Sequence, residues 1–265
     1  MPIWFYTIDA LYCALLLIAA IELVSLAGLF ITRRLILSRL HLQGTNDAVS
    51  GTVQAIGVFY GITVGLIAVG VWNTHSNASD LVSREASAIG ALYRDVSGYP
   101  EPLRGELRLK LREYTVFVID QAWPAQQNGH GQEITTGKRI MDDFQDKLQT
   151  FQPANPGQVA LHTETLTAFN KLIDSRNLRI DAVNGGVAPA MWAVIWVGAA
   201  ISICIAYFYN ISDPKVHAIL IFLMAAFLAM LIFMITINDR PFFGRVGIPN
   251  DPYRLILQRV IDDSR

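Results

Sequence analysis

An acidic residue stands in the middle of an apolar stretch near the start of the chain. Glu22 lies close to the centre of residues 10–32, where an ionised carboxylate is costly in a bilayer. An acid in this position is typical of a proton relay, a cation site or a carboxyl kept neutral by burial. The structural alternative is a protonated Glu22 that hydrogen-bonds to a neighbouring helix, with Thr63 or Gln54 as its partner.

A stripe of glycines occupies the second apolar stretch. Gly57, Gly61 and Gly65 lie four residues apart, although glycine is a poor helix former. In lipid, small residues at this spacing let two helix backbones approach closely. The stripe therefore predicts helix packing, within one protomer or between copies. The alternative is that this span lines a pore, with Gln54 and Thr63 as its polar members.

Charged residues between the spans could line a vestibule or hold helices together. The stretch "SREASAIGALYRD" contains Glu85 and Arg94, and "IDSRNLRIDA" contains Arg176 and Arg179. We expect Glu85 to pair with Arg176 or Arg179 as a bundle salt bridge. An exposed pair of this kind contributes at most about 1 kcal/mol. A charged vestibule is the alternative role.

No pattern of an enzyme or of a cofactor site is evident. The histidines lack ligand spacing, and neither a phosphate-binding glycine loop with Lys nor a nucleophile elbow is present. Cys13 and Cys204 both lie in apolar stretches and form no disulfide framework or metal motif. The net charge of −1, without a basic stripe, does not indicate nucleic-acid binding. We expect no enzymatic activity, no cofactor, no metal and no nucleic-acid partner.

The elements that position these residues are predicted to be membrane spans. The chain is 52% hydrophobic and 16% charged, whereas about 25% of residues are charged in soluble domains. Crossing a bilayer takes about 20 mainly apolar residues. Four stretches meet that length: residues 10–32, 51–72, 188–209 and 217–237. The sequence therefore predicts an integral membrane protein with four spans.

The region between the second and third spans has a different composition. Its apolar residues recur at helical spacing, and no segment alternates like a strand. No proline occurs between Pro2 and Pro100, so residues 50–95 can form one helix of roughly 70 Å. The predicted fold is all-α, with an antiparallel helical bundle inserted between spans 2 and 3. Its parts are transmembrane helices 1 and 2 (1–72), a water-side bundle (73–186), transmembrane helices 3 and 4 (187–237) and an amphipathic C-terminal tail (238–265).

The arginines give conflicting indications of orientation. Arg33, Arg34 and Arg39 follow the first span and place that loop in the cytoplasm by the positive-inside rule, with the bundle outside. Arginines of the tail and those flanking the bundle favour the opposite placement. First spans usually dominate this rule, which favours a bundle outside the cytoplasm.

Four stretches resemble the bestrophin-like domain family, a group of four-span proteins of bacteria and plants. They are "ELVSLAGLFITRR", "EASAIGALYR", "SRNLRIDA…VAPAMWAV" and "NDRPFFGRVGIPNDPY". The resemblance implies a pentameric channel of the bacterial inner (plasma) membrane, with its second helix lining the pore and its bundle in the cytoplasm. The second span lacks the aromatic constriction of true bestrophins, and no acidic calcium clasp is evident. Ion selectivity and calcium gating are therefore not implied.

These observations lead to a functional hypothesis with two alternatives. The hypothesis is a homo-oligomeric pore for small ions, with Glu22 behind or beside the second span and the bundle as a vestibule. The alternatives are a non-conducting, membrane-anchored helical scaffold or sensor that binds a partner or ligand, and a proton-coupled carrier acting through Glu22. The carrier is less well supported because no inverted repeat is evident. The residues that line or pack the axis would be Gln54, Gly57, Gly61, Thr63 and Gly65.

Overall fold

The computed structural model describes residues 9–37, 44–129, 134–183, 185–244 and 246–262. The fold is 84% helical, and no strand occurs in these ranges. The predicted all-α class is confirmed. The chain divides into two compact units, each described here by itself. The membrane unit comprises Met1–Thr74 and Gly186–Asp239, and the bundle unit comprises His75–Gly185 and Arg240–Arg265.

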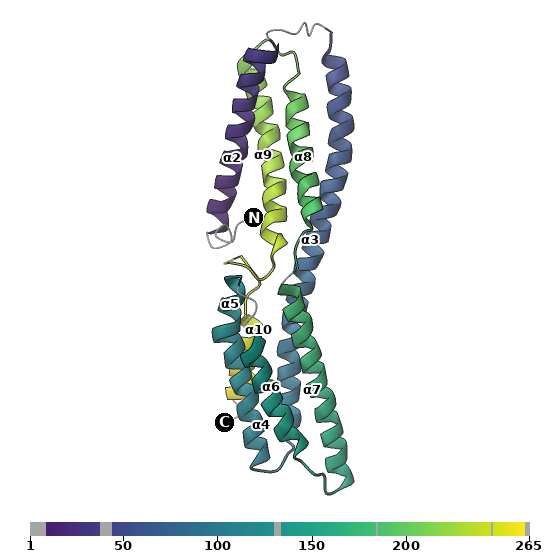
Figure 1. Cartoon of the computed structure of the whole chain (residues 1–265), viewed down its shortest axis with the longest axis vertical. Coiled ribbons are helices and arrows are strands. Elements are labelled where there is room, and N and C mark those ends of the chain that lie inside the picture. Colours follow the sequence, from purple (N-terminus) through teal and green to yellow (C-terminus); the bar gives the residue numbers. More distant parts are fainter. Residues whose placement is uncertain (1–8, 38–43, 130–133, 184, 245, 263–265) are drawn as a thin grey trace. The chain divides into compact units, whose positions relative to one another are not determined.

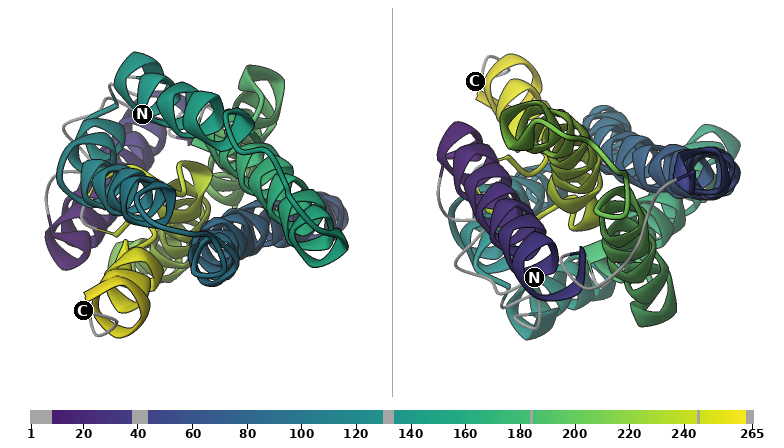
Figure 2. Two further views of the ribbon diagram at one scale, coloured as in Figure 1. Left: turned by 90° about the horizontal axis from the view of Figure 1, so that it is seen from below. Right: turned by 90° about the horizontal axis from the view of Figure 1, so that it is seen from above.

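Four helices of the described chain are long and apolar enough to cross a membrane, which confirms the four predicted spans. In the membrane unit, α2 packs along α9 and α8 also packs on α9 (Figures 1 and 2). The first part of α3 belongs to this unit. The helices are α2 (Ala10–Thr32), which continues into the π-helical segment η1 (Arg33–Leu37), α3 (Asn46–Val96), α8 (Pro189–Ala206) and α9 (Pro214–Asp239).

Helix α3 contains 51 residues and belongs to both units. It has no internal proline, so no backbone N–H is missing from its hydrogen-bond ladder. The prediction that residues 50–95 form one continuous helix is confirmed. Residues of α3 in the membrane unit and residues of α3 in the bundle unit therefore follow one helical register.

A tyrosine joins the α8 end of the membrane unit to α2. Tyr207 donates its hydroxyl to the carbonyl oxygen of Ser25 at 2.7 Å. Its ring occupies the space that a side chain on Gly28 would need, because a Cβ there would lie 2.6 Å from the Tyr207 oxygen. Gly28 is thus required by a close approach.

The same arrangement joins α3 to α8. Tyr60 donates its hydroxyl to the carbonyl oxygen of Ile195 at 2.9 Å, and its ring fills the notch at Gly198. Here too the glycine follows the accepting carbonyl by three residues. Each tyrosine therefore buries its ring against a bare backbone and places its hydroxyl on a carbonyl one turn earlier.

The bundle unit surrounds one apolar core. Helix α4 packs along α6, and the rings of Phe144 and Phe169 stack with centroids 5.3 Å apart. The C-terminal segment contributes to this core through Phe242 and Tyr253, whose rings meet Trp123 edge-on. The elements, besides the second part of α3, are α4 (Leu103–Phe117), η2 (Val118–Ala122), α5 (Trp123–Gln127), α6 (Ile134–Gln149), α7 (Pro156–Val183), α10 (Asp251–Ile256) and η3 (Leu257–Asp262).

Two of the long helices begin with a capping side chain followed by proline. The Asn155 side chain accepts the N–H of Gln158 at 2.9 Å where α7 begins, and Asp213 accepts the N–H of Lys215 at 2.8 Å where α9 begins. The cap satisfies an N–H that has no partner in the first turn, and proline has none to satisfy there. These short signals fix where both helices start.

Candidate functional site

Helix α3 presents three different faces within the membrane unit. The inner face is buried, whereas residues of the outer face are 58–70% exposed. At about 100° per residue, the glycines lie between the two, with Gly61 about 60° from Val64 and about 100° from Ile62. The inner face consists of Tyr60, Val64, Ala68 and Val71, the outer face of Val58, Ile62, Leu66 and Val69, and the glycine stripe of Gly57, Gly61 and Gly65.

The glycine stripe is not occupied by packing inside the protomer. A Cβ built on Gly57, Gly61 or Gly65 would meet no atom within 4 Å. Gly57 and Gly61 open onto an apolar groove of about 180 Å³ between α3, α8 and α9. In contrast, Gly28 and Gly198 are filled by tyrosine rings. The stripe therefore has room for a helix or chain that the protomer itself does not supply.

The two polar residues of the second span do not share one face of α3. Gln54 lies within about 20° of Gly61 around the helix, whereas Thr63 lies about 160° away from Gly61. Both side chains are exposed and bond locally. Gln54 donates to the Ser50 hydroxyl at 3.2 Å, and Thr63 donates to the Phe59 carbonyl at 2.8 Å. Gln54 and Thr63 therefore cannot both face the same axis as the stripe.

Glu22 is buried in the membrane unit and has no hydrogen-bond partner in the part of the chain that the structure describes. Its side chain lies on the buried face of α2, the residue is 7% exposed, and neither carboxyl oxygen accepts or donates a hydrogen bond. The suggestion that Thr63 or Gln54 holds it is wrong, because neither residue lies within hydrogen-bonding reach of a Glu22 oxygen, and each bonds within its own helix. An unpaired ionised carboxylate in an apolar environment is strongly unfavourable, so the geometry suits the neutral acid.

Glu85 and Arg179 form an ion pair in the interior of the bundle unit. Arg179 Nε lies 2.5 Å from Glu85 Oε2, and the two side chains are 2% and 0% exposed. The predicted pairing is confirmed for Arg179, but its expected exposure is wrong. Because helices α3 and α7 carry these residues on their core-facing sides, the pair is removed from water. Removal of either partner would leave the other as an uncompensated buried charge.

Two further side chains complete this buried network. Tyr114 donates its hydroxyl to Glu85 Oε1 at 2.6 Å, and Arg179 Nη1 donates to Gln126 Oε1 at 3.2 Å. Burial, to which the negative charge of Glu85 adds, raises the pKa of Tyr114. The sequence analysis did not identify Tyr114 or Gln126 as partners. The heptad-like spacing of Leu107, Leu111 and Tyr114 was the available signal, since it places Tyr114 on the core face of α4.

The proposed vestibule charges are only partly on the surface. Arg176 is buried and Arg94 is exposed, so a vestibule role is excluded for Glu85 and Arg179 and retained only by Arg94. Arg94 borders a groove of about 760 Å³ between α3 and α7. Other charged residues of this groove are Asp80, Arg84, Lys171 and Asp174. Among the described residues, no cluster of His, Cys, Asp or Glu could hold a metal ion.

A comparison with sequence families gives one match over most of the chain. The sequence model described as the Bestrophin-like domain matches residues 19–253. Among proteins of curated function, none shows significant similarity.

Solved structures share the fold. Two structures of a bacterial bestrophin homologue from Klebsiella pneumoniae, each a point variant, have TM-scores of 0.71. They are 11% and 10% identical, cover 94% of this chain, and are covered over 98% and 99% of their own length. A structure described only as a membrane protein has a TM-score of 0.72 at 10% identity, with 94% and 97% coverage. At this identity the likeness shows the fold alone.

Proposed function

Because the chain belongs to the Bestrophin-like domain family, we propose that it forms a homo-oligomeric ion channel whose axis is lined by α3. The family and the fold support a channel-type protein of the membrane. The finer proposal concerns which face of α3 meets the ions and which face meets the next copy. A ring of copies, five by analogy with the family, would place one α3 from each around the centre.

The observation that carries the proposal is the division of α3 into three faces. The inner face is buried against the protomer, and the glycine stripe beside it is open. Small residues at this spacing allow close helix contacts in lipid, so the stripe suits the side of a neighbouring copy. The outer face, about 100° further round from Gly61, would then point toward the axis. In this arrangement the glycines pack the ring and do not themselves line the pore.

The chemistry of the outer face suits a gate. Val58, Ile62, Leu66 and Val69 form an apolar stretch, and a ring of such side chains can block ions by excluding water. By helical register the same angular sector continues in the bundle unit with Asp80, Ser87 and Arg94. An ion would then pass from a narrow apolar region to a polar one along the same helix.

The direct test is single-channel recording from purified protein in planar bilayers. Ile62→Ser introduces a polar group into the apolar constriction and should increase open probability several-fold. Ile219→Ser on α9 is the matched control, because both isoleucines are 58% exposed in the protomer. Equal effects of the two variants would contradict the assignment of the outer face. Absence of current under voltage, pH and ligand screens would contradict a channel.

Subunit stoichiometry provides an independent test. Native mass spectrometry should show a ring of four or more copies. A monomer or a dimer would instead support the non-conducting scaffold or sensor, since too few copies of α3 would be present to enclose a pore.

A further inference from the structure

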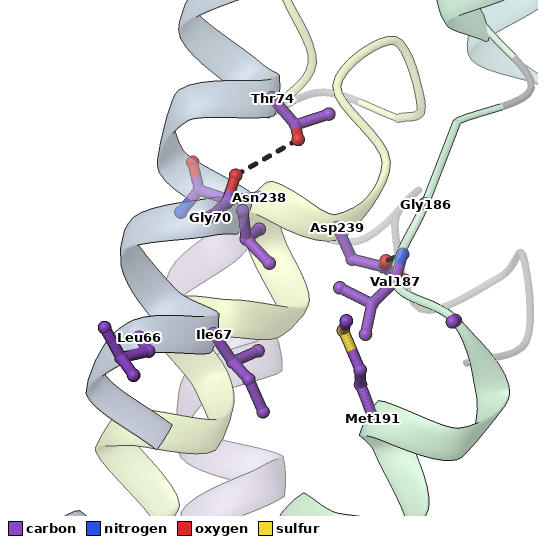
Figure 3. A pocket seen from close by; sticks show the side chains of 11 residues that line it. Leu66, Ile67, Gly70, Thr74, Gly186, Val187, Met191, Asn238 and Asp239 are labelled. Atoms are coloured by element: carbon purple, nitrogen blue, oxygen red, sulfur yellow. Dashed lines mark hydrogen bonds between the residues drawn. The ribbon is translucent and has the colours of Figure 1, made fainter. Parts of the chain in front are cut away.

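A pocket of about 460 Å³ lies in the membrane unit where α3, the segment before α8 and the end of α9 come together (Figure 3). Its walls include Leu66, Ile67 and Met191, and three polar side chains gather at its other end. The polar side chains are Thr74, Asn238 and Asp239. Neither the glycine stripe nor the outer-face gate accounts for a pocket with apolar walls at one end and polar side chains at the other.

Of the described residues that line the pocket, Asp239 alone is ionisable. One carboxylate oxygen, Oδ1, accepts the backbone N–H of Val187 at 2.6 Å. Within the described chain, the other oxygen, Oδ2, has no hydrogen bond, and Asp239 has no ion pair, although the residue is only 5% exposed. Asp239 also ends α9, and the carbonyls at a helix C-terminus carry partial negative charge. This end of the pocket therefore favours a cation.

The two neutral side chains add two acceptor oxygens, and Asn238 also keeps one N–H donor. Thr74 donates its hydroxyl to the carbonyl of Gly70 at 3.1 Å, which leaves the Thr74 oxygen able to accept. Asn238 donates through Nδ2 to the Met234 carbonyl at 2.8 Å, and its amide oxygen remains. With Asp239 Oδ2, the pocket offers three acceptor oxygens. A primary ammonium has three N–H donors, whereas a quaternary ammonium has none.

The apolar end of the pocket can be reached from outside the protomer. Met191 is 49% exposed and Ile67 is half-buried, both on predicted membrane spans. Asp239 is the last residue of α9, so in a bilayer that α9 crosses it would lie near the headgroups. A ligand with a cationic head and an alkyl chain could enter from the membrane without leaving it.

We infer that this pocket binds the primary ammonium headgroup of a membrane aminophospholipid. The ammonium lies against Asp239, and an acyl chain follows Ile67 and Met191. Charge complementarity and the supply of acceptors select the primary amine over choline headgroups. This site does not depend on ion conduction, so it can fail or succeed independently of the proposed channel.

The experiment uses the full-length protein in mixed micelles with equal phosphatidylethanolamine and phosphatidylcholine, and counts retained lipids by native mass spectrometry. We expect roughly tenfold enrichment of phosphatidylethanolamine, the effect of a charge-assisted hydrogen bond. Asp239→Asn keeps an acceptor for Val187 and should abolish the enrichment. Gly70 lines the pocket, and a Cβ there would meet no atom within 4 Å. Gly70→Leu should therefore be tolerated by the fold, fill part of the pocket and reduce retention of both lipids.

Soluble competitors separate the lipid from other occupants. Hexylammonium should displace phosphatidylethanolamine from the wild type, whereas hexanol should not. Equal retention of the two lipids, or unchanged enrichment in both variants, would overturn the inference. Binding of hexylammonium without lipid enrichment would also overturn it, because the occupant would then be a free amine.

Discussion

The membrane unit and the bundle unit each bury a glutamate, and the two glutamates have opposite surroundings. Glu85 is fully buried and is bonded by Arg179 and Tyr114. Glu22 is 7% exposed and has no hydrogen-bond partner among the described residues. The bundle unit thus compensates its buried charge within one protomer. The membrane unit does not, which suits an acid that stays neutral in an apolar environment.

The two units also differ in what they leave uncovered. The bundle unit encloses its aromatic residues in one core, which includes Phe144, Tyr114 and Tyr253. The membrane unit leaves large apolar side chains such as Phe59 and Leu23 more than 70% exposed. In water such a surface would promote aggregation, but against lipid or another copy it is stable. The apolar side chains of the bundle unit are covered within the protomer, whereas those of the membrane unit need lipid or another copy to cover them.

Removal of Arg179 should have the largest effect on stability. Arg179→Met leaves Glu85 buried without its countercharge, so we expect a loss of about 3–5 kcal/mol in the free energy of unfolding. Denaturant unfolding of the full-length protein, followed by tryptophan fluorescence, measures this loss. The matched control is Lys147→Ala, which breaks the exposed pair with Glu106 and should cost less than about 1 kcal/mol. Similar losses in both variants would contradict the buried network.

Replacing a glycine that is packed against a side chain should lower the free energy of unfolding less than Arg179→Met does. It should lower it more than replacing a glycine with open space beside it. Gly198→Leu displaces the Tyr60 ring and its hydrogen bond to Ile195, which should destabilise the protein by about 2–4 kcal/mol. A Cβ at Gly61 would meet no atom within 4 Å, so thermal unfolding of the Gly61→Leu protomer should hardly change. Native mass spectrometry should instead show fewer assembled copies of the Gly61→Leu variant. An intact ring in that variant would rule out the stripe as a contact between copies.

The spans and the continuity of α3 could be predicted because they depend on local properties. Apolar length determines whether a helix can cross a bilayer, and the absence of proline between Pro2 and Pro100 allows a helix from Asn46 to Val96. A pairing of Glu85 with Arg176 or Arg179 followed from opposite charges on two helices predicted to be neighbours, and the packing selects Arg179. These features require only the order and type of residues along the chain.

Other features depend on which helices meet and could not be predicted from spacing. The notches at Gly28 and Gly198 contain no short motif, because the tyrosines that fill them are far away in the sequence. The burial of Tyr253 requires the C-terminal segment to join the bundle core, whereas the sequence suggested a separate tail. Likewise, Asp239 becomes a candidate site only through its contact with Val187.

Replacing the unpaired glutamate should have a moderate and opposite effect. Glu22→Leu removes an unsatisfied buried carboxyl and should stabilise the protein by about 1–3 kcal/mol in thermal unfolding. Glu22→Gln is the control, since it keeps a polar group of the same shape and should give no gain. A destabilised Glu22→Leu variant would show that the carboxyl has a partner, such as a buried water or an ion. The contrast with Glu85 would then disappear.

The smallest effect is expected at an exposed carboxylate of the bundle unit. A hydrogen bond from Arg104, together with one from the backbone of Gly105, lowers the pKa of Glu101. A carboxyl whose pKa is lower in the folded state stabilises the protein above its unfolded value of about 4.3 and loses that contribution as pH falls through the folded pKa. Glu101→Gln should therefore melt slightly below the wild type at pH 7. The difference should vanish under acidic conditions, below both values. A melting-temperature difference that stayed constant from pH 7 to pH 3 would mean that the Glu101 bonds are equally strong in the protonated acid.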